Sequence, residues 1–337
     1  MARYYALSFF LVFIFCFSSA QETPAPRASG HLFYFKPSQS LILIDGYDKG
    51  TMPLSGHAET WAFKNKKWNK IDSTDQPPRS LSGATYLGDK DLIFVYGGIG
   101  KRGYDDSLRE AYIYDGKGWN MVVGNFMGTR DHHEIAYDEN NKTIIVYGGQ
   151  NGKRELELQT WILKNNEWQA LNIPGPGPRA HHAMAYDAER KKVVLYGGSR
   201  DSSHNETWEF DGSNWNKIAS TINPGARAHH SMVYDPSRKK VLLYGGQNDE
   251  GIKGDVWTWD GKTWELLSGN GPARILPAVA FNADNNKLYV FGGNGGAGGI
   301  SIFSDLWEWD GKKWTQIDKG KIYKWDMQKD MYVNSQQ

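Results

Sequence analysis

Short apolar runs separated by turn residues recur along the chain. In one stretch the runs fill residues 183–186, 193–196, 207–210 and 215–218, and polar residues separate them. Runs of about four to eight residues rich in β-branched and aromatic side chains are typical of strands. Asp211-Gly212, Asp260-Gly261 and Asp310-Gly311 favour tight hairpins, because both residue types tolerate the backbone angles of such turns. The pattern predicts a four-stranded antiparallel meander.

The meander recurs along the chain, and its glycines reveal the repeat. Five apolar runs end in an aromatic residue followed by two glycines, and Ile44-Asp45-Gly46 is a degenerate sixth copy. The five regular doublets, 47 to 51 residues apart, are Tyr96-Gly97-Gly98, Tyr147-Gly148-Gly149, Tyr196-Gly197-Gly198, Tyr244-Gly245-Gly246 and Phe291-Gly292-Gly293. Self-similarity at such a period indicates a repeat architecture with six units.

Other positions repeat with the doublets. An arginine precedes each doublet: Arg27, Arg79, Arg130, Arg179, Arg227 and Arg274. An aromatic residue lies seven positions after each arginine: Tyr34, Tyr86, Tyr137, Tyr186, Tyr234 and Phe281. After each doublet come two aromatic residues seven apart, such as Trp208 and Trp215, with Tyr112 taking the first place in the second copy. Alternation along the third strand predicts that its aromatic residues are buried between sheets.

One four-stranded sheet cannot bury both of its faces, so the six copies are expected to stack face to face. The doublet after the second strand and the paired aromatic residues resemble the kelch repeat, and the resemblance covers Arg27 to about Ile317. It implies an all-β fold, a six-bladed β-propeller of four-stranded antiparallel blades over residues 21–318. Each blade is expected to come from one continuous repeat. The tail, residues 319–337, either adds an edge strand over the ring seam or is mobile, and we expect order near Trp325.

Composition narrows the possible partners. The chain has 38 glycines, 14 tryptophans and 18 tyrosines in 337 residues, a usage that fits many short strands and tight turns. Its 39 basic and 38 acidic residues give a formal charge of +1. A protein that follows a phosphate backbone needs a basic excess, so nucleic acid is not expected as a partner.

The N-terminal segment predicts export. Arg3 precedes an apolar run from Leu7 to Phe17, and small residues precede a cleavage position after Ala20. We therefore expect residues 1–20 to be a signal peptide and the mature chain to be secreted or periplasmic, without membrane insertion; a retained anchor is the alternative. Cys16 is the only cysteine, so the mature chain would have neither a disulfide nor a thiolate metal site.

Arginines and acids share one side of the predicted disc. Two residues before the first paired aromatic of each copy lie Glu59, Glu110, Gln159, Glu206, Asp255 and Asp305. Arginine binds carboxylate through two parallel hydrogen bonds, so we expect structural pairs between neighbouring blades, with Arg27, Arg79 and Arg274 in that role. Because Gln159 interrupts the acidic series, Arg130 or Arg179 should lack a carboxylate and stay available to an anionic ligand.

Histidine pairs follow the arginines in three consecutive copies: His132-His133, His181-His182 and His229-His230. Six imidazoles in three consecutive copies suggest a metal site. Neighbouring residues of a strand point to opposite faces, however, so the two members of a pair do not converge on one ion. We expect no metal and no other cofactor, and imidazoles that bond across the blade seams instead.

Function is expected where the copies differ, in the loops after the doublets. The candidate ligand-binding residues are Arg130, Arg179, Arg227, Tyr104, Gln150, Asn151, Arg200, His204, Gln247 and Asn248. Polar loops on a rigid frame suit a recognition module for a protein, peptide or glycan, and we expect a monomer.

An enzyme is the alternative function. Galactose oxidase, a kelch-type enzyme, needs a tyrosine cross-linked to cysteine, which the mature chain lacks. An enzyme of the sialic-acid mutarotase type, acting on an anionic sugar without metal, stays open, because an unpaired arginine would suit that substrate.

Overall fold

The computed structural model describes residues 22–48, 56–71, 76–124, 126–296, 301–326 and 331–334, except for the side chains of residues 104, 325, 331 and 332. Within these ranges the chain is all-β, with two short 3-10 helices, Lys36–Ser38 and Gly103–Asp106. Among the described residues, no helix combines the length and apolar character needed to cross a bilayer. The predicted signal peptide, its cleavage position and Cys16 lie outside the described residues.

The described residues form seven four-stranded antiparallel sheets, and six of these follow one another along the chain, each within one copy of the repeat. The first is β1 (Ala28–Phe35), β2 (Ser40–Tyr47), β3 (Thr60–Lys64) and β4 (Lys67–Ile71). The second is β5 (Gly83–Leu87), β6 (Leu92–Tyr96), β7 (Ala111–Tyr114) and β8 (Trp119–Met121). The third is β9 (Glu134–Asp138), β10 (Thr143–Tyr147), β11 (Thr160–Lys164) and β12 (Glu167–Leu171).

The last three sheets repeat this order. The fourth is β13 (Ala183–Asp187), β14 (Lys192–Tyr196), β15 (Thr207–Phe210) and β16 (Trp215–Ile218). The fifth is β17 (Ser231–Asp235), β18 (Lys240–Tyr244), β21 (Val256–Trp259) and β22 (Trp264–Ser268). The sixth is β23 (Ala278–Asn282), β24 (Lys287–Phe291), β27 (Leu306–Trp309) and β28 (Trp314–Asp318). Each sheet comes from one copy of the repeat.

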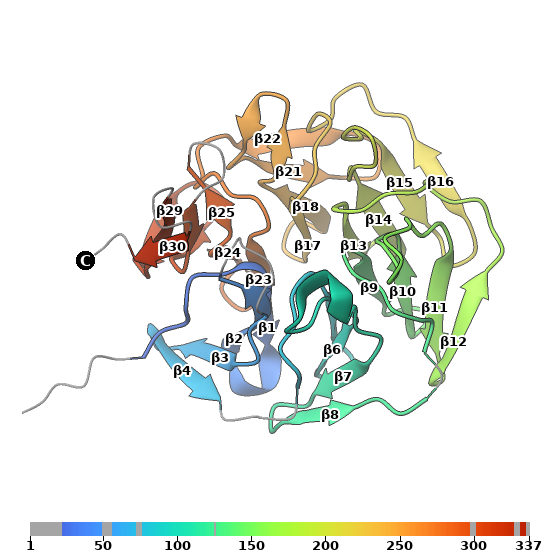
Figure 1. Cartoon of the computed structure of the whole chain (residues 1–337). Coiled ribbons are helices and arrows are strands. Elements are labelled where there is room, and N and C mark those ends of the chain that lie inside the picture. The colour runs from blue at the N-terminus through green and yellow to red at the C-terminus, as the bar shows by residue number, and fades with distance from the viewer. Residues whose placement is uncertain are drawn as a thin grey trace, which may run out of the picture.

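Apolar side chains fill the spaces between successive sheets. One cluster joins the first and second sheets through Phe35, Ile44 and Val95, and equivalent clusters join each later pair. The sixth sheet packs on the first, where Phe291 and Leu306 lie with Leu43. Figure 1 shows the sheets arranged around a common centre, with β1, β9, β13, β17 and β23 innermost. The predicted burial of the third-strand aromatic residues is confirmed for those two positions after the first paired aromatic, Phe63, Tyr114, Phe210, Trp259 and Trp309. It is wrong for four of the first paired aromatics, which are partly exposed: Trp161, Trp208, Trp257 and Trp307.

Tryptophans of the fourth strands hydrogen-bond across the seams. The indole of Trp119 donates to the Thr60 hydroxyl of the preceding sheet at 2.8 Å, and Trp264 donates to Thr207 at 2.9 Å. Trp68 of the first sheet donates to the carboxylate of Asp318, at the end of the sixth, at 2.9 Å. These tryptophans therefore add a directional contact to the apolar packing.

The C-terminal segment forms strands. β29 (Ile322–Asp326) and β30 (Met331–Asn334) extend a hairpin of β25 (Asn294–Gly295) and β26 (Ser301–Phe303), which lies in the loop after the sixth doublet. A second small hairpin, β19 (Gln247–Asn248) with β20 (Gly251–Ile252), follows the fifth doublet. The Arg27 amide donates to the Phe303 carbonyl at 3.0 Å, so the β26 segment contacts the start of the first sheet (Figure 1).

Candidate functional site

Each repeat arginine binds the first residue of its own doublet. The guanidinium of Arg130 donates to the Gly148 carbonyl at 3.0 Å, and that of Arg179 donates to the Gly197 carbonyl at 2.9 Å. The same bond, always eighteen residues along the chain, occurs in the other four copies. The arginine thereby fixes the beginning of the loop that follows the doublet.

The second glycine of each doublet binds the next copy. The Gly98 amide donates to the Arg130 carbonyl at 2.8 Å, and the amides of Gly46, Gly149, Gly198 and Gly246 make the equivalent bond to the arginines that follow them. The Gly293 amide of the sixth copy donates to the Arg27 carbonyl of the first at 2.9 Å. These bonds join the six copies in a cycle and hold the bases of their loops on one side.

The arginine side chains pair within their own copy, not between neighbouring blades as expected. Arg179 lies 2.9 Å from Glu206, Arg227 2.8 Å from Asp255, and Arg274 2.7 Å from Asp305. The pair in the first copy, Arg27 with Glu59, is longer at 3.8 Å. The pairs stay within a copy because the first and third strands flank the same second strand.

The expectation that Arg130 or Arg179 lacks a carboxylate is wrong. Arg130 lies 3.3 Å from Glu157, two residues before Gln159, and Arg179 has Glu206. In the last three copies the indole two residues after the acid donates to it, whereas the indoles of Trp61, after Glu59, and Trp161, after Gln159, have no hydrogen-bond partner. Arg130, Arg179 and Arg227 are at most 2% exposed, so a ligand cannot reach them without rearrangement.

Arg79 differs from the other arginines. No ion pair joins it to Glu110 in the part of the chain that the structure describes, although it lies over the Tyr112 ring and donates to the Glu110 backbone carbonyl. Burial lowers the pKa of Arg79, and the carboxylate of Asp45 opposes that shift. Asp45 accepts hydrogen bonds from Gln76 at 2.8 Å and Ser82 at 2.7 Å. Arg79 therefore lies near the buried carboxylate of Asp45, in the preceding copy, and not in an ion pair with the acid of its own copy.

The histidine pairs divide into two sets. His133, His182 and His230 are buried beside the first doublet glycine of the preceding copy and meet Tyr96, Tyr147 and Tyr196 edge-on, with ring centroids 5.8 to 6.0 Å apart. The ring nitrogens of these three have no hydrogen bond of good geometry. The backbone of Tyr147 nevertheless acts across the seam to raise the pKa of His182, and the backbone of Tyr196 does the same for His230, so the expected contacts across the seam are weak for this set. Burial lowers the pKa of His182 to about 3, which keeps its imidazole neutral.

The other three histidines gather at the centre. The ring centroids of His132 and His181 are 4.5 Å apart, and those of His181 and His229 are 4.0 Å apart. The His229 amide donates to the His181 carbonyl at 2.9 Å, a backbone bond between adjacent copies. Within the described ranges, no group of three metal-ligating side chains has a geometry that could hold an ion.

The loops after the doublets, together called the doublet-loop face, carry exposed polar side chains. Arg200 is 55% exposed and pairs with Asp201 at 3.2 Å, and the Gln247 side chain is exposed. Gln150, Asn151, His204 and Asn248 are partly exposed, and the side chain of Tyr104 lies outside the described part. Asn151 donates to Glu155 and Glu157, so part of its hydrogen-bonding capacity serves the loop itself.

A central cavity of about 380 Å³ lies between the innermost strands β1, β5, β9, β13, β17 and β23. Its lining runs from Ser29 and Leu276, near the arginine ends of these strands, to the first residue after each strand: Lys36, Gly88, Glu139, Ala188, Pro236 and Ala283. No described residue of the doublet-loop face lines it. The cavity is therefore not lined by the loops in which the ligand-binding residues are expected.

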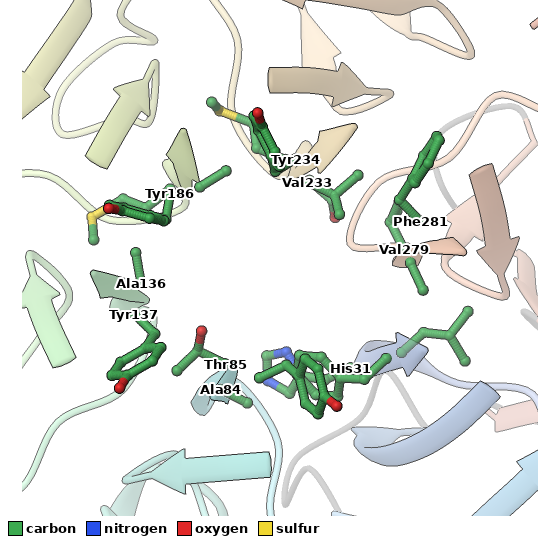
Figure 2. A pocket seen from close by; sticks show the side chains of 18 of the residues that line it. His31, Ala84, Thr85, Ala136, Tyr137, Tyr186, Val233, Tyr234, Val279 and Phe281 are labelled. Atoms are coloured by element: carbon green, nitrogen blue, oxygen red, sulfur yellow. The ribbon is translucent and has the colours of Figure 1, made fainter. Parts of the chain in front are cut away.

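Aromatic residues surround the outer part of the cavity. They are the six that follow the arginines by seven positions, and Figure 2 shows Tyr137, Tyr186, Tyr234 and Phe281 around the hollow. Tyr34 donates to Asp284 of the sixth copy, and Tyr186 accepts from the Asn140 amide of the third at 3.2 Å. Sequence reasoning found this series by its spacing but not its place, because spacing does not show which end of the strands encloses a cavity.

Two ionisable side chains of the cavity lining are His31, in β1 of the first sheet, and Glu134, in β9 of the third. The Nε2 atom of His31 lies 3.1 Å from the Ser82 carbonyl, which only accepts, so this nitrogen carries the proton. Burial lowers the pKa of His31 and raises the pKa of Glu134 to about 8. At pH 7 both groups are therefore neutral. Sequence reasoning missed Glu134, whose only signal is that small residues or other polar residues stand at its position in the other copies.

The sequence of this chain is similar to known proteins over only part of its length. No protein-family model matches the chain. A curated protein, the dynein alpha chain of the flagellar outer arm of Chlamydomonas reinhardtii, is 29% identical over 161 residues, which cover 44% of this chain. The chain spans only 4% of that protein's length, so the likeness concerns one segment.

Proposed function

We propose that the chain is a kelch-type, six-bladed β-propeller that serves as an exported recognition module. Its six sheets would be the blades, and a protein, peptide or glycan would bind across the doublet-loop face. Support for the propeller comes from the cycle of glycine–arginine backbone bonds and from the packing of the sixth sheet on the first.

One observation carries the recognition role: the arginines and glycines hold six loop bases in a fixed arrangement, while the loops themselves differ in length and chemistry. A rigid frame with variable polar loops favours binding, because the contacts are placed in advance and little ordering entropy is lost. Exposed charges of both signs, such as Arg102, Lys153, Arg200 and Glu250, suit a polar ligand surface.

A glycan and peptide array probed with residues 21–337 tests this proposal. For a ligand so found, the double variant Arg200→Ala with Gln247→Ala should lower affinity at least tenfold, because both side chains are exposed on the doublet-loop face. Lys239→Ala is the matched control, since Lys239 lies in the hairpin between β17 and β18 at the other end of the strands. Equal affinity of the double variant and the wild type for every ligand would refute this face as the binding surface.

A mutarotase-type activity is the second candidate that the sequence leaves open. It relies on an arginine free to bind an anionic sugar. Arg130 and Arg179 are buried and paired, so no observation favours this candidate.

A further inference from the structure

Glu134 is set apart among the ionisable groups that line the central cavity. The others are Lys36 and Glu139, both exposed at the mouth, the imidazoles of His31 and His230, and five tyrosines. Both imidazoles have pKa values lowered by burial, so they carry no charge at pH 7. Glu134 is thus the one carboxyl group inside the cavity among the described residues.

No ion pair joins Glu134 to a cation in the described ranges, although most other buried carboxylates here have one. Asp187, for comparison, lies 2.8 Å from Arg190, and Asp235 pairs with Arg238. Without such a partner, burial holds the pKa of Glu134 near 8. Glu134 is partly exposed, and its carboxyl group accepts a hydrogen bond from the Met184 backbone, which opposes the upward shift of its pKa. An acid in a cavity that has a raised pKa and no cation partner is typical of a functional site and not of a structural ion pair.

The surroundings of Glu134 suit a positively charged group. Each innermost strand pairs on one side only, so its other edge has unpaired backbone N–H and carbonyl groups beside the cavity, and the carbonyls can accept hydrogen bonds from a ligand. The hydroxyls of Thr85 and Ser231 also line the wall, and Ser231 donates its proton to the Pro277 carbonyl, which leaves its oxygen as an acceptor. A primary ammonium group has three donors and needs such acceptors. The aromatic residues around the outer part attract cations through their π-systems.

We propose that the central cavity binds a small organic cation with a primary ammonium group, for which Glu134 supplies the counter-charge. This site is separate from the doublet-loop face. The cavity volume of about 380 Å³ falls in the range of small-molecule pockets. A metal ion is not the expected cation, because the described residues bring no set of three ligating side chains together.

Calorimetric titration with hexylamine and with hexan-1-ol tests the proposal on residues 21–337. The two probes have similar length, and only the amine is charged at pH 7. We expect hexylamine to bind at least tenfold more tightly. Glu134→Gln should remove that preference while leaving the binding of hexan-1-ol unchanged, because glutamine resembles the protonated acid. Glu139→Gln, at the exposed mouth, is the control and should behave as the wild type.

Proton release gives a second readout. An ammonium group stabilises the ionised carboxylate, so hexylamine binding at pH 7 should release close to one proton, measured from the heats in two buffers of different ionisation enthalpy. Phe281→Leu should weaken hexylamine more than hexan-1-ol, which keeps a test available if Glu134→Gln does not fold. Equal affinities for the two probes, failure of both to bind, or amine binding without proton release would overturn the proposal.

Discussion

Asp45 occupies the position where the other five copies have the first glycine of the doublet. Beside the first doublet glycine of the second and third copies lies an imidazole from the copy that follows. A Cβ at Gly97 would lie 3.1 Å from the His133 ring, and one at Gly148 would lie 2.6 Å from the His182 ring. At the seam between the first and second copies, Ser82 stands in place of this histidine and faces Asp45. A larger side chain on one side of the seam is thus matched by a smaller one on the other.

A double-mutant cycle tests this match. Ser82→His alone should destabilise the protein by about 2 kcal/mol, because the imidazole would enter the space that the Asp45 side chain occupies. Asp45→Gly alone should also destabilise it, since it removes the counter-charge of Arg79. The double variant should be more stable than the sum of the two effects predicts, as measured by urea unfolding. Additive effects would show that the two positions do not share one space.

The residue scale also shows where spacing is insufficient. Spacing identifies the acids that pair with Arg179, Arg227 and Arg274, but it does not show that each pair lies within one copy. It misses Glu157 as the partner of Arg130 and Asp45 beside Arg79. Neither acid lies two residues before a repeat aromatic, so only the folded backbone shows that each is close to its arginine.

At the element scale, a residue in the left-handed conformation lies near the start of each innermost strand, as the second residue of β1 and two positions before each of the other five. Ser29, Leu81, His132, His181, His229 and Leu276 have φ between 51° and 62°. This conformation is unfavourable for residues with a Cβ, by about 1 kcal/mol or more each. Backbone bonds between copies, such as Leu276 amide to His229 carbonyl at 2.8 Å, offset that strain. Periodicity predicted the strands but not this bend.

The histidines at these strand starts make stability depend on pH. Burial lowers the pKa of His182 to about 3 and that of His229 to about 4, and it also lowers the pKa of His133, His181 and His230. The unfolded chain therefore binds more protons below pH 6.5, and stability is lost as the pH falls. From pH 7.5 to 5.5 we expect a loss of about 1.4 kcal/mol for each such imidazole in urea unfolding.

Glu134 acts in the opposite direction, because its raised pKa makes the folded state bind a proton that the unfolded state releases above about pH 4.5. The measurement is therefore best made with Glu134→Gln, which removes that contribution. His182→Asn in the same background should reduce the pH slope. A slope that is flat between pH 5.5 and 7.5 would contradict the neutral burial of these imidazoles.

At the scale of the whole molecule, the contacts of the sixth sheet with the first complete the arrangement. Gly293 bonds Arg27, Trp68 bonds Asp318, and Phe291 packs with Leu43. The first and fifth sheets would each expose an apolar face without the sixth. Stability is therefore expected to be shared by all six copies and not to belong to each alone.

Truncation tests this shared stability. A chain ending at Gly271 lacks the sixth sheet and should lose its cooperative urea transition and bind an apolar dye, because two sheet faces become exposed. A chain ending at Asp318 lacks only β29 and β30 and should keep a cooperative transition. Unfolding of the shorter chain with the midpoint of the full-length protein would show that the sheets are independent.

The sequence by itself determined the local structure: strands, hairpins, the sixfold repeat and the buried aromatic residues. These follow from alternation, turn residues and period, which act over a few neighbouring positions. Only the tertiary structure decided which acid meets each arginine, that three histidines from different copies meet, and that the innermost strands, including Glu134, line the cavity while the doublet loops do not. Those features depend on how copies about 50 residues apart pack against one another. A repeat that is nearly the same in every copy carries little information about that packing.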